Sequence, residues 1–176
     1  WINSLKALIK EIPKDLKEKL VSCSVAGTSG TLLACKKNGE PIGKALPYFL
    51  SLSEYSYKIK QLFTKDCAGS SISGSVGRAL RLLELYGDEI ILRHQADWLS
   101  GWLLNNWEYG EEGNNIRMGW EVLNNSWPKK FKHLSWLKCL PKIISSGEIM
   151  GNICYKKAAE LSLPKNLKVV AGTTDS

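Results

Sequence analysis

Residues 167–176, LKVVAGTTDS, place a short apolar strand directly before a loop that carries one carboxylate. The apolar run ends at Gly172, and the loop beyond it holds two threonines and Asp175. A similar pattern occurs earlier in the chain, where a half-buried strand predicted at 20–26 leads into the turn GTSGT at 27–31. In α/β sheets, ligands bind at the carboxyl ends of strands. These two loops are therefore the first candidates for a binding site.

Both loops also have ordinary structural interpretations. A Gly-Thr-Ser-Gly turn is more often a plain β-turn than a ligand loop. An Asp after a strand is more often a helix N-cap than a catalyst. No Ser-His-Asp triad is expected, because neither His94 nor His133 has a neighbouring carboxylate or nucleophile pattern, and no Walker-type phosphate loop occurs.

Strand and helix patterns alternate between the two loops. A strong helix is predicted at 73–87, with Ser73 or Ser75 as its N-cap and Gly87 at its end. An amphipathic helix is predicted at 94–107. The remaining helices are predicted at 2–12, 53–63 and 154–162, and a loop with a short helix at 111–128. The remaining strands are predicted at 31–35, 42–49 and 89–93, with a strand or turn at 147–153. This order of mixed elements indicates an α/β domain.

Composition restricts the class of protein and its partners. With 176 residues, 44% hydrophobic and 23% charged, the chain is long enough for one globular domain with a real core. The net charge is +7, but the lysines are scattered, which favours solvated faces over a nucleic-acid surface. No apolar run approaches the ~20 residues of a membrane span. Five cysteines without C-x-x-C spacing indicate reduced thiols in a cytosolic protein, with no metal site.

Four segments in the same order resemble the FGGY carbohydrate kinases, in particular the ribulokinase- and xylulokinase-like members of cyanobacteria and plastids. They are VAGTSGTLLACKKNGEPIGKAL at 25–46, HQADWLSGWLL at 94–104, LPKIISSGEIMGNI at 140–153 and LPKNLKVVAGTTDS at 163–176. The resemblance implies a ribonuclease H-like, actin-like fold with a mixed sheet flanked by helices. Family members begin with a strand and an Asp-x-Gly-Thr turn and carry a second, nucleotide-binding domain. Residues 1–176 are therefore expected to be part of the N-terminal sugar-binding domain.

The resemblance also implies a reaction, the phosphorylation of a ketose or polyol hydroxyl by ATP with Mg²⁺, with D-ribulose or D-xylulose as the expected sugar. Asp175 matches the general base of the family. The ATP and the Mg²⁺ would be bound mainly by parts outside 1–176, so this chain alone is expected to be inactive. The alternative is a relative that binds a sugar without phosphorylating it. Neither nucleic acid nor a membrane is an expected partner, and a homodimer is left open. The expected compartment is the cytoplasm, or the plastid stroma if the protein comes from a plant.

The resemblance finally assigns sugar-facing positions. It implies that the strands at about 20–26 and 168–172 lie parallel in one sheet, so that their loops meet. The stretch PYFLSLSE lacks the Asp and Arg expected near its aromatic residue, which leaves the identity of the sugar open. An Asp that precedes a helix, Asp97, is expected to be structural. The expected substrate-binding residues are Ser29, Thr28, Gly30, Tyr48 and Ser73.

Overall fold

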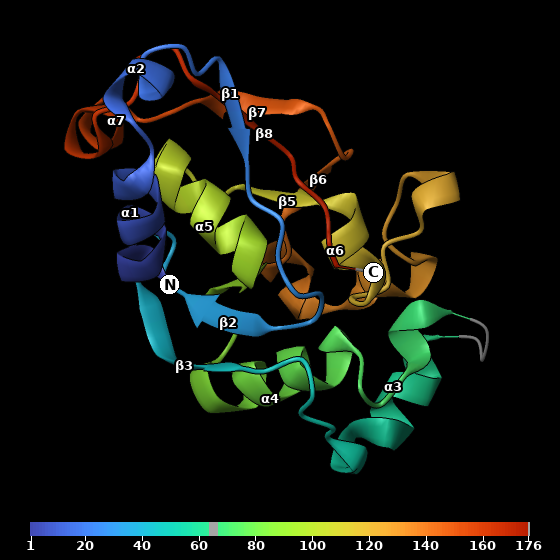
Figure 1. Ribbon diagram of the computed structural model, residues 1–176. Coiled ribbons are helices and arrows are strands. Elements are labelled where there is room, and N and C mark those ends of the chain that lie inside the picture. Colours follow the sequence, from blue (N-terminus) through green and yellow to red (C-terminus); the bar gives the residue numbers. More distant parts are fainter. Residues whose placement is uncertain (64–66, 176) are drawn as a thin grey trace.

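The computed structural model describes residues 1–63 and 67–175 (Figure 1). Its helices are α1 (Ile2–Glu11), α2 (Lys14–Lys17), α3 (Ser56–Leu62), α4 (Ser75–Tyr86), α5 (Gln95–Leu104), α6 (Glu112–Ile116) and α7 (Tyr155–Leu161). Its strands are β1 (Ser22–Ser24), β2 (Leu32–Cys35), β3 (Pro41–Leu46), β4 (Ile91–His94), β5 (Tyr109–Glu111), β6 (Lys142–Ile144), β7 (Ile149–Asn152) and β8 (Lys168–Val170). Short 3-10 helices occur at Ser53–Tyr55, Ala68–Ser70, Val122–Asn124, Lys129–His133 and Ser135–Cys139.

Within the described residues, the strands form three small sheets. The first has the order β1-β8-β7 and is mixed, because β8 pairs parallel with β1 and antiparallel with β7. The second has the order β3-β2-β4 and is antiparallel throughout, and the third pairs β5 with β6 in parallel. The expected α/β architecture is confirmed, although its strands are distributed over separate sheets.

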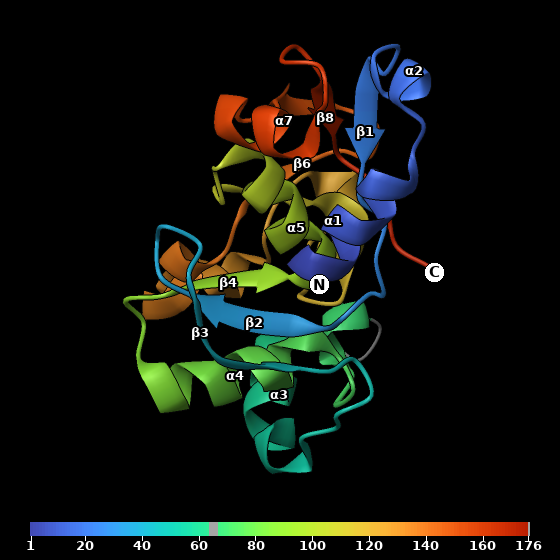
Figure 2. The ribbon, with the colours of Figure 1, turned by 60° about the vertical axis from the view of Figure 1, so that its left-hand side comes forward.

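Helix α5 lies between the two larger sheets, and α4 covers the far side of the β3-β2-β4 sheet (Figures 1 and 2). Strand β2 is buried at every position because it is the central strand of its sheet, between β3 and β4, and packs against α4. One core cluster fills the space around β2 and α4, and a second lies between β8, α5 and α7. The buried members include Leu32, Val76, Leu82 and Leu92 in the first cluster, and Trp102, Leu161, Leu167 and Val169 in the second.

Local sequence signals account for most element boundaries. Helix α1 ends just before Pro13, and the β2–β3 hairpin turns at Gly39, whose φ of 79° favours glycine. Helix α4 ends at Gly87, as predicted, but the predicted serine N-cap is wrong, because the N-cap is Gly74 and makes no side-chain cap bond. The prediction that α5 is amphipathic is also wrong, since it lies between two sheets and is buried on nearly every side.

None of the described helices is both long and apolar enough to cross a membrane. All five cysteines are free thiols. Cys35 and Cys139 are buried, and burial raises the pKa of both thiols. These two side chains are core residues, and at neutral pH their thiols stay protonated and unreactive.

Candidate active site

The loops after β1 and β8 meet at one edge of the first sheet. Because β1 and β8 are parallel and in register, with Ser22 opposite Lys168, both loops leave the sheet on the same side. The contact continues beyond the strands, where the Gly27 amide donates to the Thr173 carbonyl at 3.4 Å. The predicted juxtaposition of the two loops is thus confirmed.

A hydrogen bond joins the two residues that the sequence singled out. The backbone amide of Ser29 donates to Oδ1 of Asp175 at 3.0 Å, across 146 positions in sequence. Ser29 is buried, whereas Asp175 lies at the exposed end of its loop. The amide therefore fixes one carboxylate oxygen, and the carboxylate stays within reach of solvent and of a ligand.

Two glycines make this approach possible. A Cβ added at Gly172 would lie 2.2 Å from the carbonyl oxygen of Val25, so any side chain there would force the two loops apart. Gly30 follows Ser29 with φ at 94°, a conformation that L side chains rarely adopt. The backbone geometry around the Ser29–Asp175 contact therefore depends on glycine at both positions.

A buried arginine ties the Ser29 loop to two further loops. Arg78 on α4 is only 1% exposed. Its Nε donates to the Gly30 carbonyl at 2.8 Å, and Nη2 donates to the Ser73 carbonyl at 3.0 Å. Its Nη1 donates to the carbonyls of Tyr48 at 3.2 Å and Leu50 at 2.7 Å. One guanidinium thus holds together the backbones of three of the predicted sugar-facing residues.

No carboxylate of the described residues forms an ion pair with Arg78, so backbone carbonyls alone stabilise its charge. Burial, and to a lesser extent the nearby Arg117 cation, lowers the pKa of Arg78 to about 10. The side chain is still protonated at neutral pH. Sequence reasoning missed this residue, although Ser75, Arg78, Ala79 and Leu82 share the spacing of one buried helix face.

A cleft of about 370 Å³ opens beside the contact between the loops. Ser29 lines it, and the side chains of Tyr48 and Ser73 do not, since the structure holds those two residues mainly through their carbonyls. Thr28 is half-buried, and Gly30 lies next to Arg78 behind the wall. The lining residues are Ser29, Ala68, Gly113, Ile116, Arg117, Thr173 and Thr174.

The opposite wall of the cleft comes from α6, which sequence reasoning treated only as a loop and a short helix. Glu111 caps α6 by accepting from the amides of Gly113 at 2.6 Å and Asn114 at 2.8 Å. Asp97 accepts from the Glu111 amide at 2.9 Å and from the Asn115 side chain at 3.1 Å. The prediction that Asp97 is structural is therefore confirmed, because it fixes the position of α6.

The expectation that no histidine has a neighbouring carboxylate or nucleophile is wrong for His94. Its Nε2 lies 2.8 Å from Ser75 Oγ, and its Nδ1 lies 3.7 Å from Asp97 Oδ2. The order resembles a catalytic triad, but the His–Asp distance is too long for a hydrogen bond. All three side chains are at most 2% exposed, and none lines a described cleft. The three residues form part of the buried polar network under α4 and α6.

No protein-family model matches the sequence of this chain. Solved structures match it over nearly its whole length. A carbohydrate kinase from Novosphingobium aromaticivorans has a TM-score of 0.80 at 18% identity, covering 98% of this chain and 39% of that chain. A xylulose kinase from Rhodospirillum rubrum has a TM-score of 0.80 at 13% identity, covering 97% of this chain and 39% of its own length.

A glycerol kinase from Plasmodium falciparum, solved with ADP, agrees with these two matches. Its TM-score is 0.77 at 17% identity, and the match covers 97% of this chain and 38% of that chain. This chain has the carbohydrate-kinase fold. It spans about two fifths of the length of these solved kinases.

The carbohydrate-kinase fold confirms the fold class expected from the sequence, including its actin-like, ribonuclease H-like architecture. Within this fold, the structure brings Ser29 and Asp175 into contact and leaves Tyr48 and Ser73 outside the cleft lining. It adds Arg117 as an exposed cation at the cleft and Arg78 as the buried residue behind its wall. Neither arginine carries a local sequence motif that would have singled it out.

Proposed function

We propose that residues 1–176 are the sugar-binding part of an ATP-dependent carbohydrate kinase whose acceptor is a ketose or polyol hydroxyl. The observation that carries this proposal is the bond between the Ser29 amide and Asp175 at the edge of the cleft. A carboxylate that a backbone amide holds in place, in an exposed loop after a strand and beside a cleft, has the placement that a general base needs.

In the proposed reaction, Asp175 accepts the proton of the acceptor hydroxyl. The hydroxyl oxygen then forms a bond to the terminal phosphorus of ATP, the bond from that phosphorus to the bridging oxygen breaks, and ADP leaves. Because Ser29 occupies Oδ1, the proton goes to Oδ2. A well-positioned base contributes about 10² to 10⁴-fold to such a step.

The sugar would lie against the wall formed by Ser29, with Thr28 and Gly30 behind or beside it. Arg117 and the threonines at 173–174 supply further polar groups on the cleft surface. The exposed rings of Tyr48 and Phe49 pack edge-to-face at 5.4 Å and would bind only a substrate that extends beyond the cleft. D-ribulose and D-xylulose remain the proposed sugars, on the strength of the sequence resemblance.

Among the described residues of the two loops, Asp175 is the only one with a carboxylate side chain. In the described part of the chain, no group of three or more His, Cys, Asp or Glu side chains is arranged to hold a metal ion. We propose that Mg²⁺ and the nucleotide bind mainly outside residues 1–176, since this chain covers only about two fifths of the solved kinases that it matches. Both would be held by the remainder of a longer polypeptide, and the chain alone would be inactive.

The test uses the longer polypeptide that contains this chain. Purified protein is incubated with MgATP and a panel of D-ribulose, D-xylulose, glycerol and gluconate, and ADP release is followed. Sugar-dependent ADP release with one of these acceptors is the expected result. Sugar binding by calorimetry without ADP release would identify the non-catalytic relative instead, and neither binding nor turnover would contradict the proposal.

A further inference from the structure

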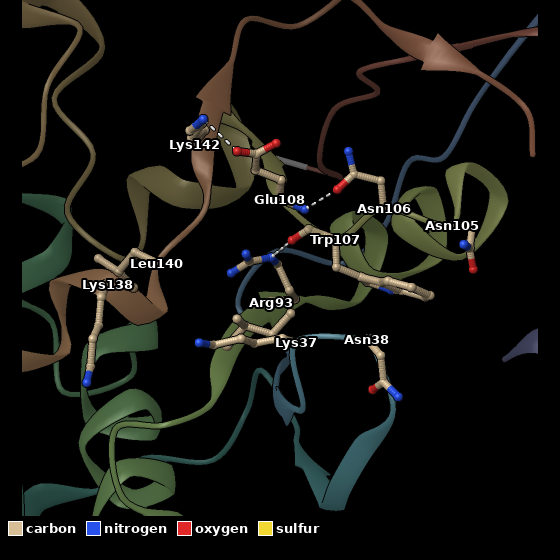
Figure 3. A pocket seen from close by; sticks show the side chains of 11 residues that line it. Lys37, Asn38, Arg93, Asn105, Asn106, Trp107, Glu108, Lys138, Leu140 and Lys142 are labelled. Carbon is tan, nitrogen blue, oxygen red and sulfur yellow. Dashed lines mark hydrogen bonds and ion pairs between the residues drawn. The ribbon is translucent and has the colours of Figure 1, made fainter.

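Figure 3 shows a second and larger cleft, of about 530 Å³. The two clefts share no lining residue among the described parts of the chain. The walls of this second cleft come from the β2–β3 turn, β4, the segment between α5 and β5, and residues 138–142 at the start of β6. We call it the basic cleft and define it by Lys37, Arg93, Trp107, Glu108, Lys138 and Lys142.

Arg93 is the buried centre of the basic cleft. It is 3% exposed, and its Nε donates to the Trp107 carbonyl at 2.5 Å. Its Nη1 donates to the carbonyls of Leu92 at 2.6 Å and Cys139 at 3.0 Å. Its Nη2 makes no hydrogen bond with any other residue that the structure describes. Burial lowers the pKa of Arg93 to about 10, so the guanidinium is charged at neutral pH and retains donors for a ligand.

Three lysines line the same cleft as this arginine. Lys37, on the β2–β3 turn, makes neither a hydrogen bond nor an ion pair with a described residue. Lys142 pairs with Glu108 at 2.5 Å, and Lys138 pairs with Glu89 at 2.5 Å and Asp88 at 3.4 Å. The side chains of Lys138 and Lys142 are 52% and 72% exposed. Ion pairs this exposed are weak, so each lysine can leave its carboxylate and pair with another anion.

The wall opposite the lysines is rigid. A Cβ added at Gly39 or Gly101 would lie 2.0 Å or 2.4 Å from the Trp107 ring, which shows how closely this indole packs on the backbone. The Trp107 indole also donates to the Trp98 carbonyl at 3.1 Å. Asn38, Asn105 and Asn106 also line the basic cleft. The side-chain oxygens of Asn38 and Asn106 accept from the backbone amides of Glu40 at 3.1 Å and Glu108 at 2.9 Å, which leaves their NH₂ groups as donors. The cleft therefore combines a fixed aromatic wall, neutral hydrogen-bonding groups and a surplus of positive charge.

We propose that the basic cleft binds a small phosphorylated ligand, with its phosphate on Arg93 and on lysines that line the cleft. A phosphate dianion can form ion pairs with more than one cation and can accept hydrogen bonds from the free N–H groups of a guanidinium. The hydroxyl-bearing remainder of the ligand would bind the asparagine amides against Trp107. A cleft of this volume is in the usual range for small-molecule sites. The carboxylate of Glu108 would be released from Lys142 rather than contact the phosphate.

The test is a titration of the 176-residue chain with inorganic phosphate and with glycerol 3-phosphate, at constant ionic strength, followed by ¹H–¹⁵N NMR. Glycerol is the control ligand without a charge. Citrate is the control anion, with carboxylates in place of a phosphate. Saturable shifts of the Asn38 and Trp107 amides with both phosphates are expected. Shifts confined to Ser29 and Thr173 would place the phosphate in the candidate active site and overturn the proposal, as would binding of citrate alone.

Charge-reversal variants supply the second arm. Lys37→Glu and Lys142→Glu change exposed side chains in the basic cleft, and each should weaken phosphate binding by about tenfold or more. Lys44→Glu, an exposed lysine on β3 outside the cleft, is the matched control and should have little effect. Equal weakening by all three variants would indicate a general charge effect and overturn the proposal. Arg93→Lys is a further variant, but the lysine variants decide the question even if it fails to fold.

Discussion

Replacing Arg78 by methionine tests whether one buried guanidinium holds the loops of the candidate site. The substitution keeps an unbranched, helix-favouring side chain of similar length but leaves four carbonyls, those of Gly30, Tyr48, Leu50 and Ser73, without their donor. A buried polar group that loses its partner costs about 1–3 kcal/mol. Four such groups give a gross loss of about 4–12 kcal/mol.

Part of this loss is offset, because methionine does not carry a charge that must be buried. The pKa of Arg78 falls from 12.5 to about 10, and at about 1.4 kcal/mol per pKa unit the buried charge costs about 3 kcal/mol. Solvent entering near the exposed Tyr48 would relieve part of the loss as well. We therefore expect a net destabilisation of about 3–5 kcal/mol, which is the gross loss from the unpaired carbonyls reduced by these two effects.

The assay is urea unfolding of the purified chain, followed by tryptophan fluorescence. Arg81→Met is the matched control, since it changes an exposed arginine on the same helix and should have a much smaller effect. The expected loss is a large fraction of the free energy of unfolding, which is usually about 5–15 kcal/mol for a domain. If Arg78→Met and Arg81→Met lowered the free energy of unfolding equally, the account of Arg78 as the link between the loops would be wrong.

Two further predictions concern packing and pH. Gly172→Ala should destabilise the chain by about 1–3 kcal/mol and shift the Ser29 amide in NMR, because its Cβ would lie 2.2 Å from the Val25 carbonyl oxygen. Gly77→Ala, inside α4 and with only ordinary contacts, is the control and should not destabilise. Burial raises the pKa of Cys35 from 9.0 to about 12, so this thiol contributes stability below pH 9 that is lost as the pH rises toward 12. The melting temperature should therefore fall more steeply with pH across that range than it does for Cys35→Ala. An equal fall for both proteins would contradict the raised pKa of Cys35.

The strand endings and the two loops could be predicted from the sequence because their signals are local. A short apolar run that ends at glycine marked β8, and the resemblance to a kinase family then implied the parallel pairing with β1. The geometry that supports the site could not be predicted in this way. Arg78 bonds to carbonyls at positions 30, 48 and 50, and no periodicity or motif connects residues so distant in sequence.

Two wrong predictions, the serine N-cap of α4 and the amphipathic character of α5, have the same physical origin. Ser75 has the chemistry of an N-cap, but its hydroxyl instead contacts the ring of the buried His94, which ends strand β4. Helix α5 has the spacing of an amphipathic helix, but sheets on two sides bury nearly all of it. In both cases a tertiary neighbour outweighs the local preference, and the identity of that neighbour depends on the fold.

The central claim is that Asp175 is the base that accepts the proton of a sugar hydroxyl, and Asp175→Asn in the longer polypeptide tests it most directly. Asparagine keeps an oxygen that can accept from the Ser29 amide, so the contact between the loops is preserved while the proton acceptor is lost. With MgATP and the accepted sugar, kcat should fall by about 10²-fold or more, while sugar binding weakens only modestly. Turnover close to that of the unmodified enzyme would mean that Asp175 only fixes the loop, because Asn and Asp serve structural positions of this kind about equally.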